Sequence, residues 1–165
     1  MVDKSDIAMS GIIAGTTITR LGWAVLIRGE SGRGKSDLAL RAICQPIQLP
    51  SETGIQPFQL VSDDQTLVTV CDGLLLTSPP ETLRNLIEVR GIGIISAPSI
   101  AGLPLALIVD LAEAAIERFP DYPGGTDVLL GQTIDVVRVA PFEASAPLKI
   151  ALALARSIEH LAKAI

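Results

Sequence analysis

The sequence predicts an α/β fold in which a buried strand leads through a glycine-rich loop into a helix. The apolar run Trp23–Ile27 has the length of a buried strand and ends just before Gly29. The segment Asp37–Ile43 is rich in helix formers, and Pro46 stops it. Strand, loop and helix in this order predict the core of the fold, with a mixed sheet around it.

The next part of the chain predicts more β-structure. Pro46–Pro57 holds proline, serine, glycine and glutamine and is expected to be an exposed loop, and Phe58–Ser62 is the second predicted strand. Leu67–Cys71 and Leu74–Thr77 flank Asp72-Gly73, a dipeptide that supplies the two positive φ angles of a type I′ turn. A β-hairpin is therefore predicted here.

The second half of the chain predicts shorter elements before a final helix. In order, we expect a helical turn over Pro79–Leu86, strands over Ile92–Ile95 and Leu105–Val109, a short helix over Glu113–Arg118 and a loop over Pro120–Gly125. Ser145 can cap a last helix with Pro147 in its first turn. Steps of three and four residues place four apolar side chains of this helix on one face: Ile150, Leu154, Ile158 and Leu161.

Length and charge limit the possible partners. Residues 1–165 have the usual length of one domain and are expected to form a single unit. The net charge of −5 argues against nucleic acid or a membrane surface as the main partner, since binding a polyanion needs a broad basic face. Two prolines and Asp110 interrupt the longest apolar stretch, Ile92–Leu111, so no membrane span is expected. Residues 1–6 carry no secretory signal, and a cytoplasmic location is expected.

The strongest functional signal is a complete GxxxxGK[ST] motif with a strand before it and a helix after it. Its glycines let consecutive backbone N–H groups turn inward and hold a polyphosphate at the helix N-terminus. Lys35 would neutralise the β- and γ-phosphate oxygens, Ser36 would bind Mg²⁺, and Arg33 would either contact phosphate or point to water. The motif predicts ATP binding by Gly29, Glu30, Ser31, Gly32, Arg33, Gly34, Lys35 and Ser36.

Candidate carboxylates follow two of the predicted strands. Asp63-Asp64 is the first candidate, and because adjacent strand residues point to opposite faces, one acid could deprotonate an acceptor hydroxyl while the other holds metal or Ser36. A solvated turn is the alternative. Leu105–Asp110 has the form of a Walker B strand, which makes Asp110 a rival, and its alternative role is a strand-end cap.

Three further polar residues are of interest. Two of them, Glu88 and Arg90, have two interpretations, and the third, His160, lies far from the motif. Glu88 and Arg90 are two residues apart and would share one side of an extended chain. They could be a metal-binding acid beside a phosphate-binding base, or a surface ion pair. His160, the only histidine, lies on the last helix and is expected at the surface.

Three segments resemble HPr kinase/phosphorylase in their order and approximate spacing. They are VLIRGESGRGKSDLAL at Val25–Leu40, LVSDDQ at Leu60–Gln65 and LIEVRGIGII at Leu86–Ile95, the last being the family's signature segment. The length resembles the short alphaproteobacterial forms that lack the family's N-terminal domain. The resemblance implies a P-loop α/β core related to phosphoenolpyruvate carboxykinase, and often a hexamer.

The resemblance also implies an activity, namely ATP- and Mg²⁺-dependent phosphorylation of a serine of the phosphocarrier protein HPr, which the family can also dephosphorylate. By resemblance, the acidic pair supplies the group that deprotonates this serine, with Asp64 dominant. The implied catalytic residues are Asp63, Asp64, Lys35, Arg90 and Arg118, and the implied metal ligands are Ser36 and Glu88.

Two departures from the family favour the kinase direction over the phosphorylase direction. The family usually has a histidine eight residues before the glycine that opens the P-loop strand, and counting back from Gly22 gives Ala14. The family's basic Gly-Arg-Asn loop, associated with dephosphorylation, is replaced by Pro141–Lys149. A nucleotide-sensing module without catalysis is an alternative that these departures would suit. A small-molecule kinase is a further alternative, which the sparse basic residues after Arg118 argue against.

Overall fold

The computed structural model describes residues 9–164, so the expectation for residues 1–6 lies outside the described residues. The helices are α1 (Lys35–Cys44) and α2 (Ala146–Lys163), with a 3₁₀ turn at Glu81–Leu83. The strands are β1 (Ser10–Ala14), β2 (Thr16–Arg20), β3 (Trp23–Arg28), β4 (Gln59–Ser62), β5 (Gln65–Cys71), β6 (Leu74–Ser78), β7 (Leu86–Val89), β8 (Gly93–Ser96), β9 (Leu103–Leu111), β10 (Gly125–Leu129) and β11 (Gln132–Val139).

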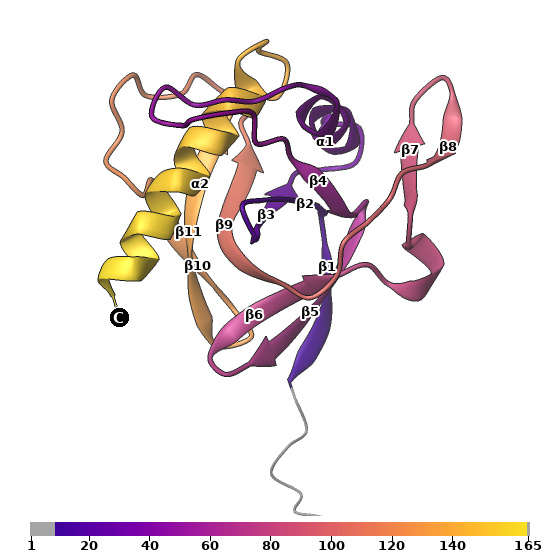
Figure 1. Cartoon of the computed structure of the whole chain (residues 1–165), viewed down its shortest axis with the longest axis horizontal. Helices are drawn as coiled ribbons and strands as arrows, with labels where there is room; N and C mark the ends of the chain where they lie inside the picture. The colour runs from indigo at the N-terminus through magenta and orange to yellow at the C-terminus, as the bar shows by residue number, and fades with distance from the viewer. Residues whose placement is uncertain (1–8, 165) are drawn as a thin grey trace, which may run out of the picture.

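A mixed sheet forms the centre of the molecule (Figure 1). Its strands follow the order β1-β5-β6-β9-β3-β2-β4, with β11 beside β9 and β10 beside β11. Strands β3, β9 and β11 run parallel, and β4 points the same way because it is antiparallel to β2, which is antiparallel to β3. The carboxyl ends of these four strands therefore meet at one edge of the sheet, which is where ligands bind in open α/β sheets.

Both faces of the central strands are buried. On one face, α1 and α2 cover a cluster that includes Ile18, Val25, Ile27, Leu107 and Val109 (Figure 1). On the other face, strands β5, β6 and β11 contribute Val68, Leu75 and Ile134 to a second cluster with Ala24, Leu26, Leu105 and Ile108. A third cluster of Leu60, Ile87 and Ala97 joins the β7–β8 hairpin to β4 and, through Leu40 and Ile43, to α1. Packing is mainly aliphatic, with Phe58 buried in the first cluster, and it fixes the edge that carries the glycine-rich loop.

The predicted core elements are confirmed. Strand β3, helix α1, strand β4 and helix α2 form where the sequence predicts them. The β5–β6 hairpin turns at Asp72 and Gly73 with φ angles of 49° and 76°, as a type I′ turn requires. Ser145 stands at the N-cap of α2, although its hydroxyl makes no capping hydrogen bond. Within residues 9–164, no helix has the length and hydropathy needed to span a membrane.

Three local predictions are wrong. Glu113–Arg118 is irregular rather than helical, and every residue of this segment is exposed, so a helix would have had no apolar face to bury. The Pro46–Pro57 loop is not exposed throughout, because Ile47 and Leu49 are buried in the core. The helical turn ends at Leu83, since Leu86 already begins β7.

Candidate functional site

The glycine-rich motif forms the loop between β3 and α1. Gly34 stands immediately before the helix with φ +96°, a left-handed conformation that is accessible to glycine at little cost. The first N–H groups of α1 have no partner within the helix, so they are available to an anion. The Lys35 ammonium donates to the carbonyl oxygens of Gly29 and Glu30, at 2.7 and 3.1 Å. The Lys35 ammonium is thus held against the loop that is predicted to bind phosphate.

Asp63 lies buried at the end of β4 and is held by three hydrogen bonds. Its Oδ1 accepts from the hydroxyls of Ser36, at 2.6 Å, and Thr16, at 3.0 Å. Its Oδ2 accepts from the backbone N–H of Glu88, at 2.9 Å. One carboxylate therefore orients the hydroxyl of Ser36 and fixes strand β7 beside the glycine-rich loop.

Asp64 has a different environment from its neighbour. Its φ angle is 65°, a left-handed value that aspartate tolerates better than most residues, and its side chain is exposed. The backbone carbonyl of Asp64 accepts from the N–H of Gly15, at 2.8 Å, and its N–H donates to the Thr16 hydroxyl, at 3.2 Å. The backbone is therefore fixed while the carboxylate faces an open cavity. The two acids differ in position, but strand alternation is not the reason, because β4 ends at Ser62 and the backbone of Asp64 is left-handed.

A cavity of about 360 Å³ joins the loop to the signature segment. Its lining includes Lys35, Ser36, Asp64, Glu88, Arg90 and Phe142. Glu88 reaches the cavity from β7, and Arg90 follows the end of that strand. The Arg90 guanidinium stands over the loop at Gly32. If Gly32 carried a Cβ, that atom would lie 3.5 Å from Nη2 of Arg90. Residues from four separate sequence segments thus converge on one cavity.

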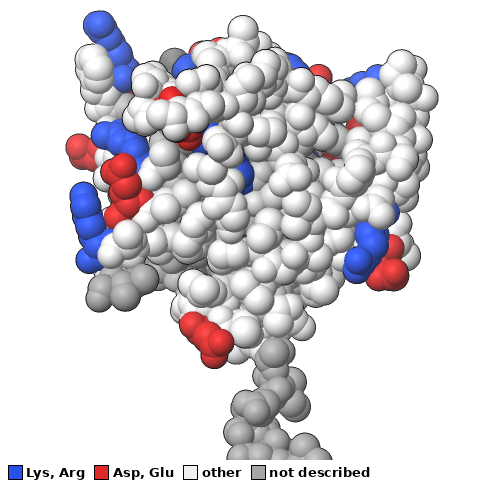
Figure 2. Space-filling model, in the orientation of Figure 1, with Lys and Arg blue, Asp and Glu red and all other residues white. Residues whose placement is uncertain are grey.

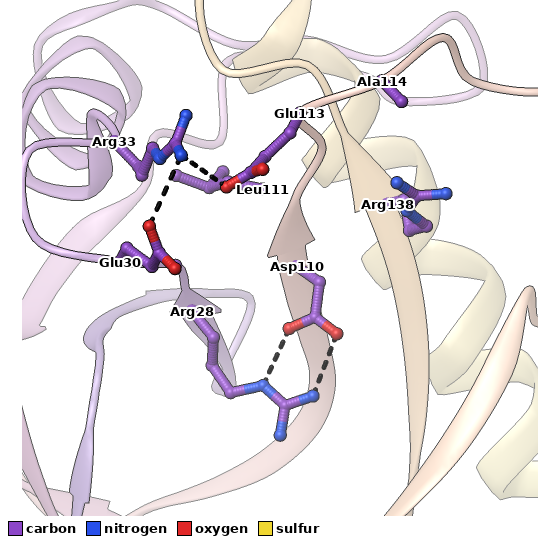
Figure 3. Close-up of a pocket in the computed structure, with 9 residues that line it drawn as sticks. Arg28, Glu30, Arg33, Asp110, Leu111, Glu113, Ala114 and Arg138 are labelled. Atoms are coloured by element: carbon purple, nitrogen blue, oxygen red, sulfur yellow. Dashed lines mark hydrogen bonds and ion pairs between the residues drawn. The ribbon is translucent and has the colours of Figure 1, made fainter.

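Asp110 lies outside this cavity and is committed to a different partner. Figure 3 shows its carboxylate paired with the Arg28 guanidinium, with distances of 2.8 and 3.0 Å. The hydrogen bonds that the Arg28 guanidinium donates to Asp110 and to Asp127 raise the pKa of Arg28 above its ordinary value. Asp110 is therefore the acid of an ion pair between β9 and β3, and it is Asp63 that accepts a hydrogen bond from Ser36.

Two predicted arginines also point elsewhere. Arg33 turns away from the loop interior and pairs with Glu113 at 2.7 Å and with Glu30 at 3.4 Å (Figure 3). Arg118 lies in the exposed segment after β9, with its guanidinium carbon 5.1 Å from the centre of the Phe119 ring. It does not line the P-loop cavity in this structure. His160 is mostly exposed, as expected, and its Nδ1 lies 3.1 Å from Asp135.

The oxygen-rich lining of the cavity fits a magnesium ion that arrives with a nucleotide. Ser36 contributes a hydroxyl oxygen, and Glu88 and Asp64 contribute exposed carboxylates. No cluster of three or more histidine, cysteine, aspartate or glutamate side chains suited to a metal occurs in residues 9–164. Mg²⁺ does not need such a cage, because it commonly binds through one or two carboxylates together with substrate phosphates and water.

Charge is scattered on the face that Figure 2 displays. Figure 2 shows basic and acidic side chains near the edges of the displayed face, with a broad uncharged area between them. At the cavity, the positive charge that could hold a polyphosphate comes from Lys35 and Arg90.

Two residues of the site were not found from the sequence. Thr16 connects Asp63 to the backbone of Asp64, yet it is 47 residues from Asp63 and no local pattern marks it. Phe142 lines the cavity from the loop before α2. An aromatic residue in a chain that is only 3% aromatic, placed in a turn segment, is the signal that could have singled it out.

Replacing Gly34 by alanine is expected to disrupt the loop. A Cβ at this position would lie 3.0 Å from the Phe142 ring on a backbone with φ +96°. The left-handed strain alone costs about 1–2 kcal/mol, and ATP affinity should fall at least as far, by about 10-fold. Gly73→Ala is the matched control, since its φ is +76° with open space around it. Calorimetric titration with ATP should show weaker binding for Gly34→Ala and unchanged binding for Gly73→Ala; equal affinities would contradict the expectation.

Comparisons with known proteins find relatives of this chain. A family model described as the HPr Serine kinase C-terminal domain matches residues 5–107. The chain is 36% identical over 129 residues to the HPr kinase/phosphorylase of Verminephrobacter eiseniae, covering 71% of this chain and 37% of that protein. It is 37% identical over 93 residues to the HPr kinase/phosphorylase of Clostridium tetani, covering 56% of this chain and 27% of that protein.

The fold has a counterpart among solved structures. The structure of the Hpr(Ser) kinase/phosphatase from Coxiella burnetii matches with a TM-score of 0.73 and 22% sequence identity, over 92% of this chain and 98% of that chain. This likeness shows a shared mixed α/β fold. The chain spans 37% of the length of the first curated relatives, while the family model covers more than half of its 165 residues. The chain therefore belongs to the HPr serine kinase C-terminal domain family.

Proposed function

We propose that the chain is an ATP- and Mg²⁺-dependent protein-serine kinase whose acceptor is the phosphocarrier protein HPr. The observation that carries the proposal is the arrangement of the acidic pair: Asp63 is fully engaged with Ser36, Thr16 and the Glu88 backbone, while Asp64 faces the P-loop cavity. Family membership supports the choice of a protein acceptor, since the relatives bear the name HPr kinase/phosphorylase.

The residues of the cavity suit the separate tasks of phosphoryl transfer. Lys35 and the N–H groups at the start of α1 would hold a polyphosphate, and Arg90, standing over the loop, would offset the charge that develops during transfer. Ser36 and Glu88 would hold Mg²⁺, with Asp63 keeping the serine hydroxyl oriented. Bound Mg²⁺ would neutralise phosphate charge.

Asp64 is the proposed general base. Its exposed carboxylate would take the proton of the acceptor serine as the serine oxygen forms a bond to the γ-phosphorus. The bond from that phosphorus to the bridging oxygen breaks in the same transfer, and ADP carries away the negative charge. In-line positioning and charge stabilisation supply most of the rate in such transfers, which is why one accessible carboxylate beside a P-loop is sufficient machinery.

The test is label transfer from γ-labelled ATP to HPr of the same organism, with Mg²⁺ present. Wild-type protein should label HPr, and Lys35→Met should lose about 10²-fold or more, because a lysine on the β- and γ-phosphate oxygens stabilises the charge of the transition state. Lys163→Met removes an exposed lysine near the end of α2 and should label HPr like wild type. Equal labelling by wild type and Lys35→Met would place the activity outside the P-loop and contradict the proposal.

A nucleotide-responsive module without catalysis is a second candidate, and one observation favours it. Ala14 pairs with Gln65 across β1 and β5, directly beside the backbone of Asp64. The position where the resemblance expects a histidine is therefore next to the proposed base, and alanine supplies no imidazole there. This candidate predicts ATP binding with no labelling of HPr and no release of phosphate.

A further inference from the structure

Phe142 is a large apolar side chain left mostly in solvent at the rim of the P-loop cavity. Its exposed fraction is 74%, although burying such a ring would normally stabilise the fold by roughly 1.5–3 kcal/mol. The ring lines the same cavity as Lys35, Ser36 and Asp37. It also packs against the last glycine of the loop, where a Cβ on Gly34 would meet two of its ring carbons at 3.0 and 3.1 Å. An open aromatic face therefore borders the phosphate-binding loop.

The backbone that carries this ring is fixed. The Arg41 guanidinium, projecting from α1, donates to the carbonyl oxygens of Pro141 and Glu143 on either side of Phe142. Arg41 is itself held by Asp37, at 2.9 Å, and Glu143 pairs with Lys149 of α2. The segment is therefore tied to both helices, and the position of the ring relative to the loop is set before any ligand arrives. Such preorganisation reduces the entropy lost on binding.

The sheet topology says which end of a nucleotide this ring would meet. Strand β4, which ends at the acidic pair, lies on one side of β3 beyond β2, and β11, which leads to Phe142, lies on the other side beyond β9. Under the proposed function, the γ-phosphate faces Asp64, Glu88 and Arg90. The other end of the nucleotide would then point towards the β11 side of the same cavity, where Phe142 stands.

We propose that Phe142 is the surface on which the base of the bound nucleotide stacks. The inference rests on the proposed function as far as nucleotide binding, and adds a residue that none of the motifs contains. Stacking on a ring face does not read the hydrogen-bonding edges of a base, so the same contribution is expected for ATP and GTP. Inorganic tripolyphosphate has no base and should gain nothing from the ring.

The experiment measures binding of Mg²⁺-ATP and Mg²⁺-tripolyphosphate to the full chain by calorimetry. Phe142→Ala should weaken ATP binding by roughly 5- to 100-fold, the range of base–aromatic stacking in alanine substitutions, and leave tripolyphosphate binding unchanged. Phe142→Leu keeps an apolar side chain without a ring and should behave like alanine, whereas Phe142→Trp should retain ATP affinity. Phe119→Ala is the matched control, because Phe119 is 79% exposed and lies in the segment after β9.

The other outcomes would contradict either the stacking inference alone or the proposed function as well. Unchanged ATP binding by Phe142→Ala, or equal losses for ATP and tripolyphosphate, would overturn the stacking inference and leave the P-loop assignment intact. An affinity of Phe142→Leu equal to wild type would show a need for bulk alone and would also overturn it. Wild-type protein that binds neither ATP nor tripolyphosphate would remove the proposed function together with this inference.

Discussion

Replacing Asp64 by asparagine is expected to slow phosphate transfer to HPr by about 10²–10⁴-fold, the range that a positioned general base contributes. The amide has the size of the carboxylate but cannot take the serine proton. Asparagine tolerates the left-handed φ of 65° at this position, so the variant should fold. ATP affinity should stay close to that of wild type, because Lys35 and the loop N–H groups remain in place. Labelling of HPr in single turnover, with ATP binding measured on the same preparation, checks both statements.

Asp72→Asn provides the matched control for this substitution. Asp72 is also exposed and also left-handed, with φ 49°, but it lies in the β5–β6 turn away from the cavity. The control should transfer phosphate at the wild-type rate. A wild-type rate for Asp64→Asn would exclude Asp64 as the base, and parallel losses of binding and transfer would assign it to the metal or nucleotide instead.

Removing Glu52 is expected to destabilise the fold by about 3–5 kcal/mol, the cost of leaving a buried charge without its partner. The Arg20 side chain on β2 is only 1% exposed, and its guanidinium donates to Glu52 at 2.5 Å and to the Gln56 carbonyl at 2.7 Å. Glu52 also accepts from the N–H of Leu49, at 2.8 Å. Glu52→Ala therefore leaves the buried Arg20 guanidinium without its carboxylate partner. It also removes a hydrogen bond that holds the loop over one end of the core. Denaturant unfolding, followed by circular dichroism, measures the loss.

The stability penalty of Glu52→Ala should depend on pH. The hydrogen bond from Arg20 holds the pKa of Glu52 below its ordinary value, because it favours the charged carboxylate. A carboxylate with a lowered folded-state pKa stabilises the fold fully above the unfolded-state pKa of about 4.3, and this contribution is lost as the pH falls through the folded-state value. The gap between wild type and variant should therefore be full at neutral pH and shrink in acid.

An exposed pair supplies the comparison for Glu52. Glu81 pairs with Arg84 at 3.3 Å, with side chains that are 86% and 50% exposed. Glu81→Ala should leave the unfolding midpoint unchanged within error, since solvent screens such pairs. A loss for Glu52→Ala no larger than that for Glu81→Ala would contradict the buried-charge argument.

Local patterns were enough to predict the elements that hold the site. The strand, glycine loop and helix over residues 23–44 carry their own apolar run and helix formers, and Asp72-Gly73 dictates its turn. Strands β1, β2, β7, β10 and β11 were not predicted. Strand β2 buries Thr16, Thr17 and Arg20, polar side chains that become acceptable only through distant partners such as Asp63, Thr66 and Glu52. Whether such a segment forms a buried strand depends on hydrogen bonds to residues far away in the sequence, which a local pattern does not contain.

In the candidate site, too, local patterns predicted some of the residues, and contacts between distant segments decided the rest. The motif and the acidic pair were found in sequence, and the cavity brings Lys35, Ser36, Asp64, Glu88 and Arg90 together. Which acid binds Ser36 depends on the hydrogen bonds from Thr16 and the Glu88 backbone, and those follow from the order of the strands. Asp110 matched a Walker B pattern, but the register of β9 against β3 places it opposite Arg28. Pairing between strands, rather than composition, therefore distinguishes Asp63, which binds Ser36, from Asp110, which pairs with Arg28.

The measurement that tests the central claim most directly is mass spectrometry of intact HPr after one turnover with Mg²⁺-ATP and this protein. The account predicts one added phosphate, mapped to a serine side chain, and no such product when Asp64→Asn replaces the wild type. Unmodified HPr from a preparation that binds ATP at the P-loop would contradict the kinase assignment and favour the nucleotide-responsive module.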